Sequence, residues 1–178
     1  MPFEFAFLDW LYQFRNPVMN TISIFFDYAG AHGEIWIAFT LLLLLFRRTR
    51  RAGFAMAVAL VLYMAAGHFF LKPLFARPRP CDVNTAITIL VKRPHGHSFP
   101  SGHTASAFAA AFALWLQNRK LGVPALVLAA FIAFTRLYLY VHFPTDVLGG
   151  LVLGIALGFF ASWLVDSLAN KSKKKQIV

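Results

Sequence analysis

Apolar runs that are long enough to cross a lipid bilayer, or nearly so, occupy most of this chain. A membrane-spanning helix needs about 20 predominantly apolar residues, and the runs Ala52–Leu71, Val123–Val141 and Val147–Leu168 meet that length. Two more, Ile35–Phe46 and Thr104–Leu116, meet it only if adjoining polar residues are included. Charged residues make up only 13% of the chain, against about 25% in soluble domains. The sequence therefore predicts an integral membrane protein.

The N-terminal segment Phe3–Gly30 is also apolar, but polar and charged residues interrupt it. Such a segment is typical of an interfacial helix followed by a shorter inserted helix. Together with the other runs, it predicts an all-α fold, a polytopic membrane helix bundle of about six transmembrane helices. We expect residues 1–178 to form a single membrane-embedded domain.

Many basic residues lie where the apolar runs end, and they predict how the helices are oriented. Lys and Arg accumulate in cytoplasmic loops, so the loops Lys72–Pro100 and His142–Thr145 are expected on the extracytoplasmic side. The same distribution accounts for much of the net charge of +10 without a nucleic-acid partner. No cleavable signal peptide is expected, because the N-terminus lacks a basic region. The basic clusters are Arg47, Arg48, Arg50 and Arg51; Arg119 and Lys120; and Lys171, Lys173, Lys174 and Lys175.

The long outer loop is itself basic, against the usual bias, which indicates that it binds an anion. Its first polar segment runs from Lys72 to Pro80 and contains Arg77 and Arg79 among prolines. The prolines favour a fixed backbone shape, although basic residues at a helix end also commonly snorkel to the interface. The loop holds the one cysteine, Cys81, which cannot form an intrachain disulfide. We expect its thiol to react with an impermeant reagent from outside, provided that the thiol is not buried in the loop.

A second polar segment, Phe99-Pro-Ser-Gly-His103, precedes an apolar helix. The unpaired N–H groups at a helix start bind phosphate, so Ser101 and the Gly102 backbone are candidates for holding one. Ser101 alternatively serves as an ordinary N-cap. His103 falls in the first helical turn, where it can protonate a leaving oxygen.

The third polar segment contains Arg136, His142 and Asp146. An unpaired cation at the depth of Arg136 costs about 2.5–3.5 kcal/mol on insertion scales, so it needs an anion or a polar pocket. Asp146 follows His142 by four residues and can keep one ring nitrogen protonated while the other attacks. Taken alone, this pair also fits an interfacial hydrogen bond. All three polar segments are expected on the same side of the membrane.

In this order the motifs resemble the signature of the type-2 phosphatidic acid phosphatase superfamily, over about Lys72–Leu168. Thr135 stands where that superfamily usually has serine. The resemblance implies a bacterial inner-membrane phosphatase that acts on a lipid phosphate, best matching undecaprenyl pyrophosphate. It further implies a phosphohistidine intermediate and these roles: His142 as nucleophile, Asp146 as its orienting group, His103 as acid and then base, and Lys72, Arg79, Ser101, Gly102 and Arg136 as phosphate ligands.

Several alternatives remain open from the sequence. Phosphatidylglycerophosphate, phosphatidic acid and lipid A phosphate are other possible substrates. The sequence also fits a protein of another functional class, a non-catalytic anionic-lipid binder or transporter. The membrane spans argue against a soluble, vanadate-dependent haloperoxidase. Neither a metal nor another cofactor is expected, because fixed cations can neutralise the phosphate, and His95, His97 and His103 have no carboxylate at ligand spacing. Oligomeric state is open. Gly150, Gly154 and Gly158 predict close helix packing.

Overall fold

The computed structural model describes residues 2–30 and 33–175, and these residues form helices and connecting loops without a strand. The all-α expectation is therefore confirmed. The helices in chain order are α1 (Pro2–Tyr12), α2 (Pro17–Ala29), α3 (Glu34–Leu45), α4 (Arg50–Tyr63), the π-helical η1 (Met64–Leu71), α5 (Lys72–Phe75), α6 (Pro80–Val83), α7 (Gly102–Gln117), α8 (Arg119–Tyr138) and α9 (Pro144–Lys175).

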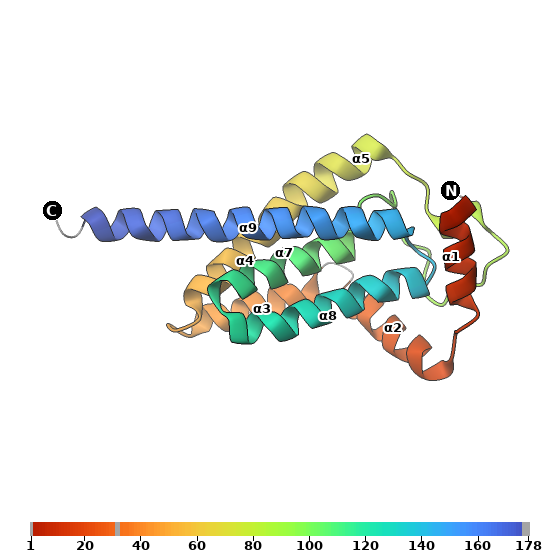
Figure 1. The fold of residues 1–178 in the computed structure, drawn as a ribbon, viewed down its shortest axis with the longest axis horizontal. Helices are drawn as coiled ribbons and strands as arrows, with labels where there is room; N and C mark the ends of the chain where they lie inside the picture. Colours follow the sequence, from red (N-terminus) through yellow and green to blue (C-terminus); the bar gives the residue numbers. More distant parts are fainter. Residues whose placement is uncertain (1, 31–32, 176–178) are drawn as a thin grey trace.

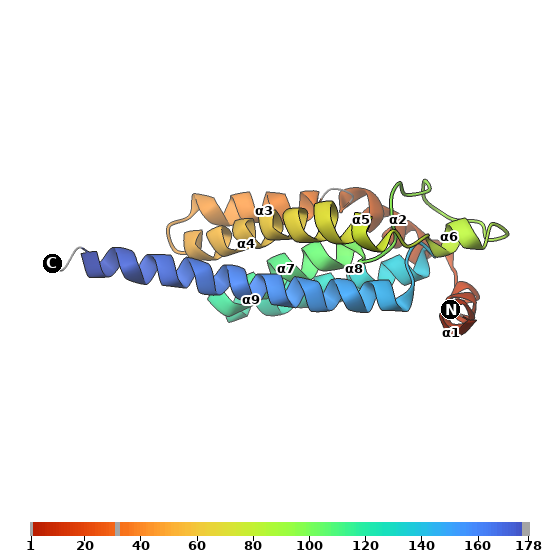
Figure 2. The same cartoon turned by 90° about the horizontal axis from the view of Figure 1, so that it is seen from above.

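Helix α7 lies at the centre of the bundle and packs against α4, α8 and α9 (Figure 1). Its sequence explains this position, because the small alanines from Ala105 to Ala113 let the neighbouring helices approach closely and are fully buried. Helix α3 packs outside α4, whereas α1 and α2 pack against α8. Figure 2, turned by 90°, shows α3 and α4 on one side of α7 and α9 on the other.

The glycine stripe of α9 provides its contact with α7, as predicted. A Cβ atom on Gly150, Gly154 or Gly158 would lie 2.7 Å from a backbone carbonyl oxygen of α7 or its N-cap. Gly150 meets the carbonyl of Ser101 in this way. The stripe therefore fixes the first turn of α9, which carries Asp146, against the start of α7.

The helices differ in their capacity to cross a membrane. Three segments are long and apolar enough: Arg50–Val83, Arg119–Tyr138 and Pro144–Lys171. Helices α2 and α3, bent by 62° relative to each other, qualify together as a fourth. Helix α7 has 16 residues and α1 has 11, so both fall short of a full span. The described residues contain α1 and α2 as separate helices, as expected, and the count of about six spans stays a prediction.

The predicted basic clusters and the predicted polar motifs lie at opposite ends of the bundle (Figure 1). The α3–α4 connection, the α7–α8 connection and the end of α9 share one end. Helices α1, α5 and α6 lie at the other. The labelling test of this second end depends on an accessible thiol, and Cys81 is fully buried. Its thiol therefore cannot report which side of the membrane the loop faces.

Candidate active site

His142 lies in a tightly packed loop between α8 and α9. Within this loop Tyr140 has a φ of 65°, a left-handed conformation that side-chain-bearing residues rarely adopt. Its hydroxyl donates to Asp9 Oδ1 of α1 at 2.7 Å, and Asn84 Nδ2 donates to it at 3.3 Å. The Tyr140 ring packs in a buried cluster with Leu8. These contacts hold the strained turn and thereby set the direction of His142.

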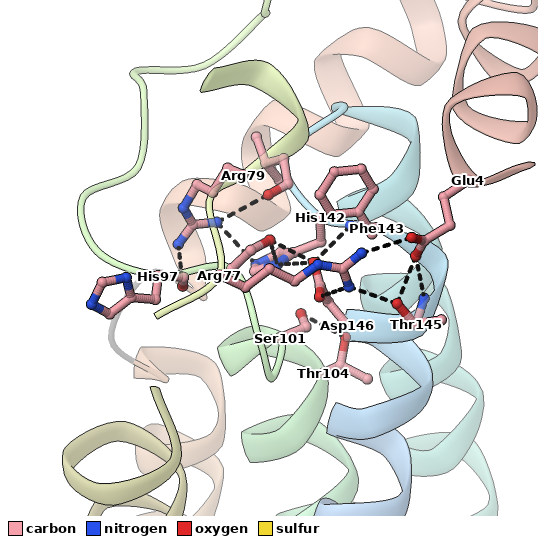
Figure 3. A network of polar contacts seen from close by, with 12 residues as sticks. Glu4, Arg77, Arg79, His97, Ser101, Thr104, His142, Phe143, Thr145 and Asp146 are labelled. Atoms are coloured by element: carbon pink, nitrogen blue, oxygen red, sulfur yellow. Dashed lines mark hydrogen bonds and ion pairs between the residues drawn. The ribbon is translucent and has the colours of Figure 1, made fainter. Parts of the chain in front are cut away.

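The His142 ring lies between an acidic and a basic partner (Figure 3). Nδ1 is 3.6 Å from Asp146 Oδ2 and 3.3 Å from Ser98 Oγ. Asp146 Oδ2 in turn accepts from Ser98 Oγ at 2.5 Å and from the Phe143 amide at 2.8 Å. On the other side of the ring, Arg79 Nη1 lies 3.2 Å from His142 Nε2.

This geometry determines the protonation of His142. A guanidinium has only donors, so Nε2 accepts from Arg79 and the ring hydrogen resides on Nδ1, facing Asp146. Burial lowers the pKa of His142 to about 3; the hydrogen bond to Asp146 opposes this shift, and the charges of Arg79 and Lys72 add to it. The imidazole is therefore neutral at physiological pH, with a lone pair on Nε2. Such a nitrogen can act as a nucleophile beside a cation that attracts phosphate oxygens.

Arg79 and Lys72 hold the outer loop through backbone carbonyls. Arg79 donates to Gly96 O at 3.1 Å and to Val141 O at 3.0 Å. Lys72 Nζ donates to His97 O at 2.7 Å. These cations are thus held in place by carbonyls of the chain itself.

Arg136 and His103 share one partner on α2, Asp27. Arg136 is buried, and its Nη1 donates to Asp27 Oδ1 at 2.6 Å, while Nη2 donates to Thr135 Oγ1 at 2.9 Å. The anion that Arg136 requires is thus supplied within the chain, and Thr135 retains the hydroxyl contact despite replacing serine. His103 Nε2 is 3.3 Å from the Asp27 carbonyl oxygen. Because a carbonyl only accepts, Nε2 bears a hydrogen, and Nδ1 is the nitrogen left for proton transfer with a ligand.

Ser101 and Gly102 begin α7 beside these groups. The Ser101 amide donates to Asp146 O at 3.0 Å, and its Oγ accepts from Thr104 Oγ1 at 3.0 Å. Ser101 occupies the N-cap position of α7, as expected, but its side chain makes no capping hydrogen bond. Gly102 is needed because a Cβ there would lie 2.6 Å from Tyr63 Oη.

The predicted residues form two hydrogen-bonded groups at one end of the bundle. His142, Asp146 and Arg79 form the first, and Arg136 and His103 form the second through Asp27. Arg79 and Arg136 are close enough to repel each other electrostatically, which places the two groups around one cationic region. Lys72 is linked to the first group through the His97 carbonyl, which accepts from both Lys72 and Arg79.

Three contributors to this arrangement have no role in the sequence interpretation. Ser98 carries no motif signal beyond its position just before the second polar segment. Asp27 has a detectable signal, because a carboxylate in an apolar run is costly unless it has a partner. Arg77 belongs to the first polar segment, and its Nη1 donates to Asp146 Oδ1 at 2.6 Å.

Comparison with known proteins agrees with this geometry. Residues 48–169 match the family described as the PAP2 superfamily. An undecaprenyl-diphosphatase of Sulfolobus acidocaldarius is 30% identical over 161 residues, covering 90% of this chain and 77% of that protein. The undecaprenyl-diphosphatase BcrC of Bacillus subtilis is 33% identical over 157 residues, covering 82% of this chain and 74% of that protein. The crystal structure of Aquifex aeolicus LpxE superposes with a TM-score of 0.71 at 27% identity, covering 89% of this chain and 94% of that one. The resemblance drawn from the three motifs is thereby confirmed, and this chain belongs to the PAP2 superfamily.

Proposed function

We propose that this membrane lipid phosphatase hydrolyses undecaprenyl pyrophosphate through a phosphohistidine intermediate, on the extracytoplasmic face of a bacterial inner membrane. The observation that carries the mechanism is the placement of His142, whose Nε2 lies beside Arg79 while Nδ1 faces Asp146. A protein that only binds anionic lipids needs the cations but has no use for an oriented, unprotonated imidazole nitrogen.

In the first step His142 Nε2 attacks the terminal phosphorus, and the bond from phosphorus to the bridging oxygen breaks. For this step His103 carries a hydrogen on both ring nitrogens. It gives the Nδ1 proton to the leaving lipid phosphate and becomes neutral, and the phosphoryl group becomes bonded to His142 Nε2. In the second step a water molecule attacks phosphorus and gives a proton to His103, and the P–N bond breaks. Inorganic phosphate leaves, and both histidines return to their starting states.

The cations make this transfer possible. Lys72, Arg79 and Arg136 neutralise the non-bridging oxygens, with Ser101 and the Gly102 amide at the start of α7 as further donors. Phosphoryl transfer depends mainly on such positioning and charge stabilisation. We propose that these fixed cations suffice without a metal ion.

The choice of lipid rests on two supports. The groups that would hold phosphate lie at one end of an apolar bundle, which suits a headgroup whose hydrocarbon tail stays in the bilayer. Two relatives that align over most of this chain are each named as an undecaprenyl-diphosphatase.

We expect the purified protein in detergent, with EDTA present, to release phosphate from undecaprenyl pyrophosphate faster than from phosphatidylglycerophosphate, phosphatidic acid or lipid A. The variant His142→Ala is expected to release none above background. The measurement is the rate of phosphate release per enzyme, for the wild type and for the variant. Faster release from another of these lipids would contradict the assignment of undecaprenyl pyrophosphate as substrate. Release by His142→Ala at the wild-type rate would contradict the assignment of His142 as nucleophile. No release from any of them would favour the anionic-lipid binder.

Sidedness can be tested with two exposed lysines at opposite ends of the bundle. In a Cys81→Ser background, Lys92→Cys is expected to react with an impermeant maleimide in intact cells. Lys120→Cys, in the first turn of α8, is expected to react only after lysis. Mass tagging on a gel measures the labelled fraction. The reverse pattern would place the active site on the cytoplasmic side.

A further inference from the structure

We propose that Arg77, held by Glu4 of the N-terminal helix α1, is a positioning residue for Asp146. The inference deepens the proposed function, because it assumes that Asp146 orients a nucleophilic His142. It assigns a role in the reaction to α1, which lies outside the three sequence motifs and outside the matched residues 48–169.

Arg77 bridges two carboxylates with short contacts (Figure 3). Its Nη1 donates to Asp146 Oδ1 at 2.6 Å, and its Nη2 donates to Glu4 Oε2 at 2.7 Å. The side chains of Asp146, Glu4 and Arg77 are 0%, 11% and 16% exposed, so solvent screens these pairs weakly. The guanidinium also stacks over the Phe143 ring at 4.2 Å, which holds it in place.

The two oxygens of Asp146 have separate partners as a result. Oδ2 faces His142 and accepts from Ser98 and the Phe143 amide. Among the described residues, only Arg77 donates a hydrogen bond to Oδ1. Arg77 therefore sets the rotation of the carboxylate about its Cβ–Cγ bond. Without Arg77, two buried carboxylates would face the same space without their shared cation, which favours protonation or rotation of one of them.

Glu4 fixes the other end of this bridge and joins it to α9. Its Oε1 accepts from Thr145 Oγ1 at 2.6 Å and faces the Thr145 amide at 3.4 Å. Thr145 precedes Asp146 in the first turn of α9, where a carboxylate is favourable for the free N–H groups. Arg77 Nη1 also donates to Thr145 Oγ1 at 2.6 Å. Glu4 thus orients Arg77 and stabilises the turn that carries Asp146.

If the Arg77–Glu4 ion pair served only to attach α1 to the bundle, substitution of Arg77 would have a different effect. Its removal would lower stability, but it would leave His142 in its active tautomer once the protein is folded. If Arg77 instead bound phosphate, its removal would chiefly raise KM. A positioning residue instead affects kcat and the protonation of His142.

The test uses Arg77→Gln, Arg77→Lys, Glu4→Gln and the double variant Glu4→Gln/Arg77→Gln in the full-length protein. Arg93→Gln is the matched control, because it removes an exposed ion pair with Asp82 in the same outer loop. Activity is measured on whichever lipid phosphate the wild type cleaves fastest. The ¹⁵N chemical shifts of histidine-labelled protein, with His142 assigned from His142→Gln, report its tautomer without any turnover.

We expect Arg77→Gln to lower kcat by about 10- to 100-fold, less than loss of the orienting carboxylate itself, with KM nearly unchanged. His142 should show loss of the pure Nδ1–H tautomer. Arg77→Lys should recover part of kcat. The double variant should be no slower than Arg77→Gln, because Glu4 acts through Arg77. Arg93→Gln should match the wild type in both readouts.

The inference is overturned if folded Arg77→Gln keeps both the wild-type kcat and the wild-type His142 tautomer, or if KM alone rises. It is also overturned if the effects of the two single variants multiply in the double variant. Failure of the proposed function would look different: the wild type would cleave none of the lipids, while the tautomer measurement would still decide the role of Arg77.

Discussion

The variant Asp146→Asn is expected to fold normally and to lose about 10³- to 10⁴-fold in kcat, as when the orienting aspartate of a serine protease triad is replaced by asparagine. The substitution changes neither the size nor the shape of the side chain appreciably. It changes which of its two terminal atoms can accept a hydrogen bond.

The surroundings of Asp146 predict how the amide would be oriented. Its oxygens face donors on both sides: Arg77 at Oδ1, and Ser98, the Phe143 amide and His142 at Oδ2. Neither Arg77 nor the Phe143 amide can become an acceptor, so the NH₂ group of asparagine faces a fixed donor in either orientation. If the amide oxygen remains at Arg77, the NH₂ group takes the Oδ2 position. The Ser98 hydroxyl can rotate to accept. His142 then meets a donor at each ring nitrogen, the asparagine NH₂ group at Nδ1 and Arg79 at Nε2, so no neutral tautomer satisfies both contacts. The tautomer that suits the NH₂ group carries its hydrogen on Nε2, which removes the attacking lone pair.

The measurement is kcat on undecaprenyl pyrophosphate, together with the melting temperature in detergent. Ser98→Ala is the comparison variant, because it removes one donor to Oδ2 but keeps the carboxylate that orients His142. We expect Ser98→Ala to lose only about 10-fold, in keeping with a partner that acts through the orienting group. A kcat for Asp146→Asn within tenfold of wild type would exclude Asp146 from the mechanism.

The helices could be predicted from hydropathy because burial in lipid requires continuous apolar runs with satisfied backbone groups. The run Val123–Val141 shows where this reasoning stops. Its helix begins earlier, at Arg119, because Asn118 Oδ1 caps it by accepting from the Leu121 amide at 3.2 Å. It ends earlier, at Tyr138, because the apolar residues Leu139 and Val141 pack with Val91 of the outer loop in a buried cluster rather than continuing the helix. Hydropathy does not distinguish apolar residues that continue a helix from apolar residues that pack in a loop.

The site residues also divide into those that the sequence indicates and those that it does not. Arg79, His142 and Asp146 could be predicted because each lies in a short motif with an identifiable chemistry. Asp27 and Glu4 could not be assigned, because their roles depend on where α2 and α1 pack against distant parts of the chain. Their partners Arg136 and Arg77 are 109 and 73 residues away. Sequence reasoning predicted that Arg136 needs an anion, but only the tertiary packing identifies which carboxylate provides it.

The variant His103→Gln is expected to trap the proposed phosphohistidine on undecaprenyl pyrophosphate. Glutamine can still donate to the Asp27 carbonyl, so the contact that anchors this side chain to α2 can be retained. It cannot exchange a proton with substrate or water. We expect kcat to fall by about 10²- to 10⁴-fold, the usual contribution of a general acid–base group.

The two steps of the reaction should be affected unequally. When a pyrophosphate is cleaved, the leaving group is a phosphate, which is stable as an anion and needs little protonation. The attack of water on the phosphohistidine needs a base, and His103→Gln has none. The intermediate should therefore form quickly and decay slowly, giving a burst of undecaprenyl phosphate close to one per enzyme before inorganic phosphate appears.

Phosphatidic acid serves as a matched control, because its leaving group is an alkoxide that requires a proton. On this substrate His103→Gln should slow the first step as well, so no burst is expected. The trapped species should be stable in base and labile in acid, and it should be absent from the double variant His103→Gln/His142→Ala. Rapid-quench measurement of both products tests the scheme. A burst on neither substrate would show that His103 does not activate water, whereas a burst that persists without His142 would move the phosphoryl group to another residue.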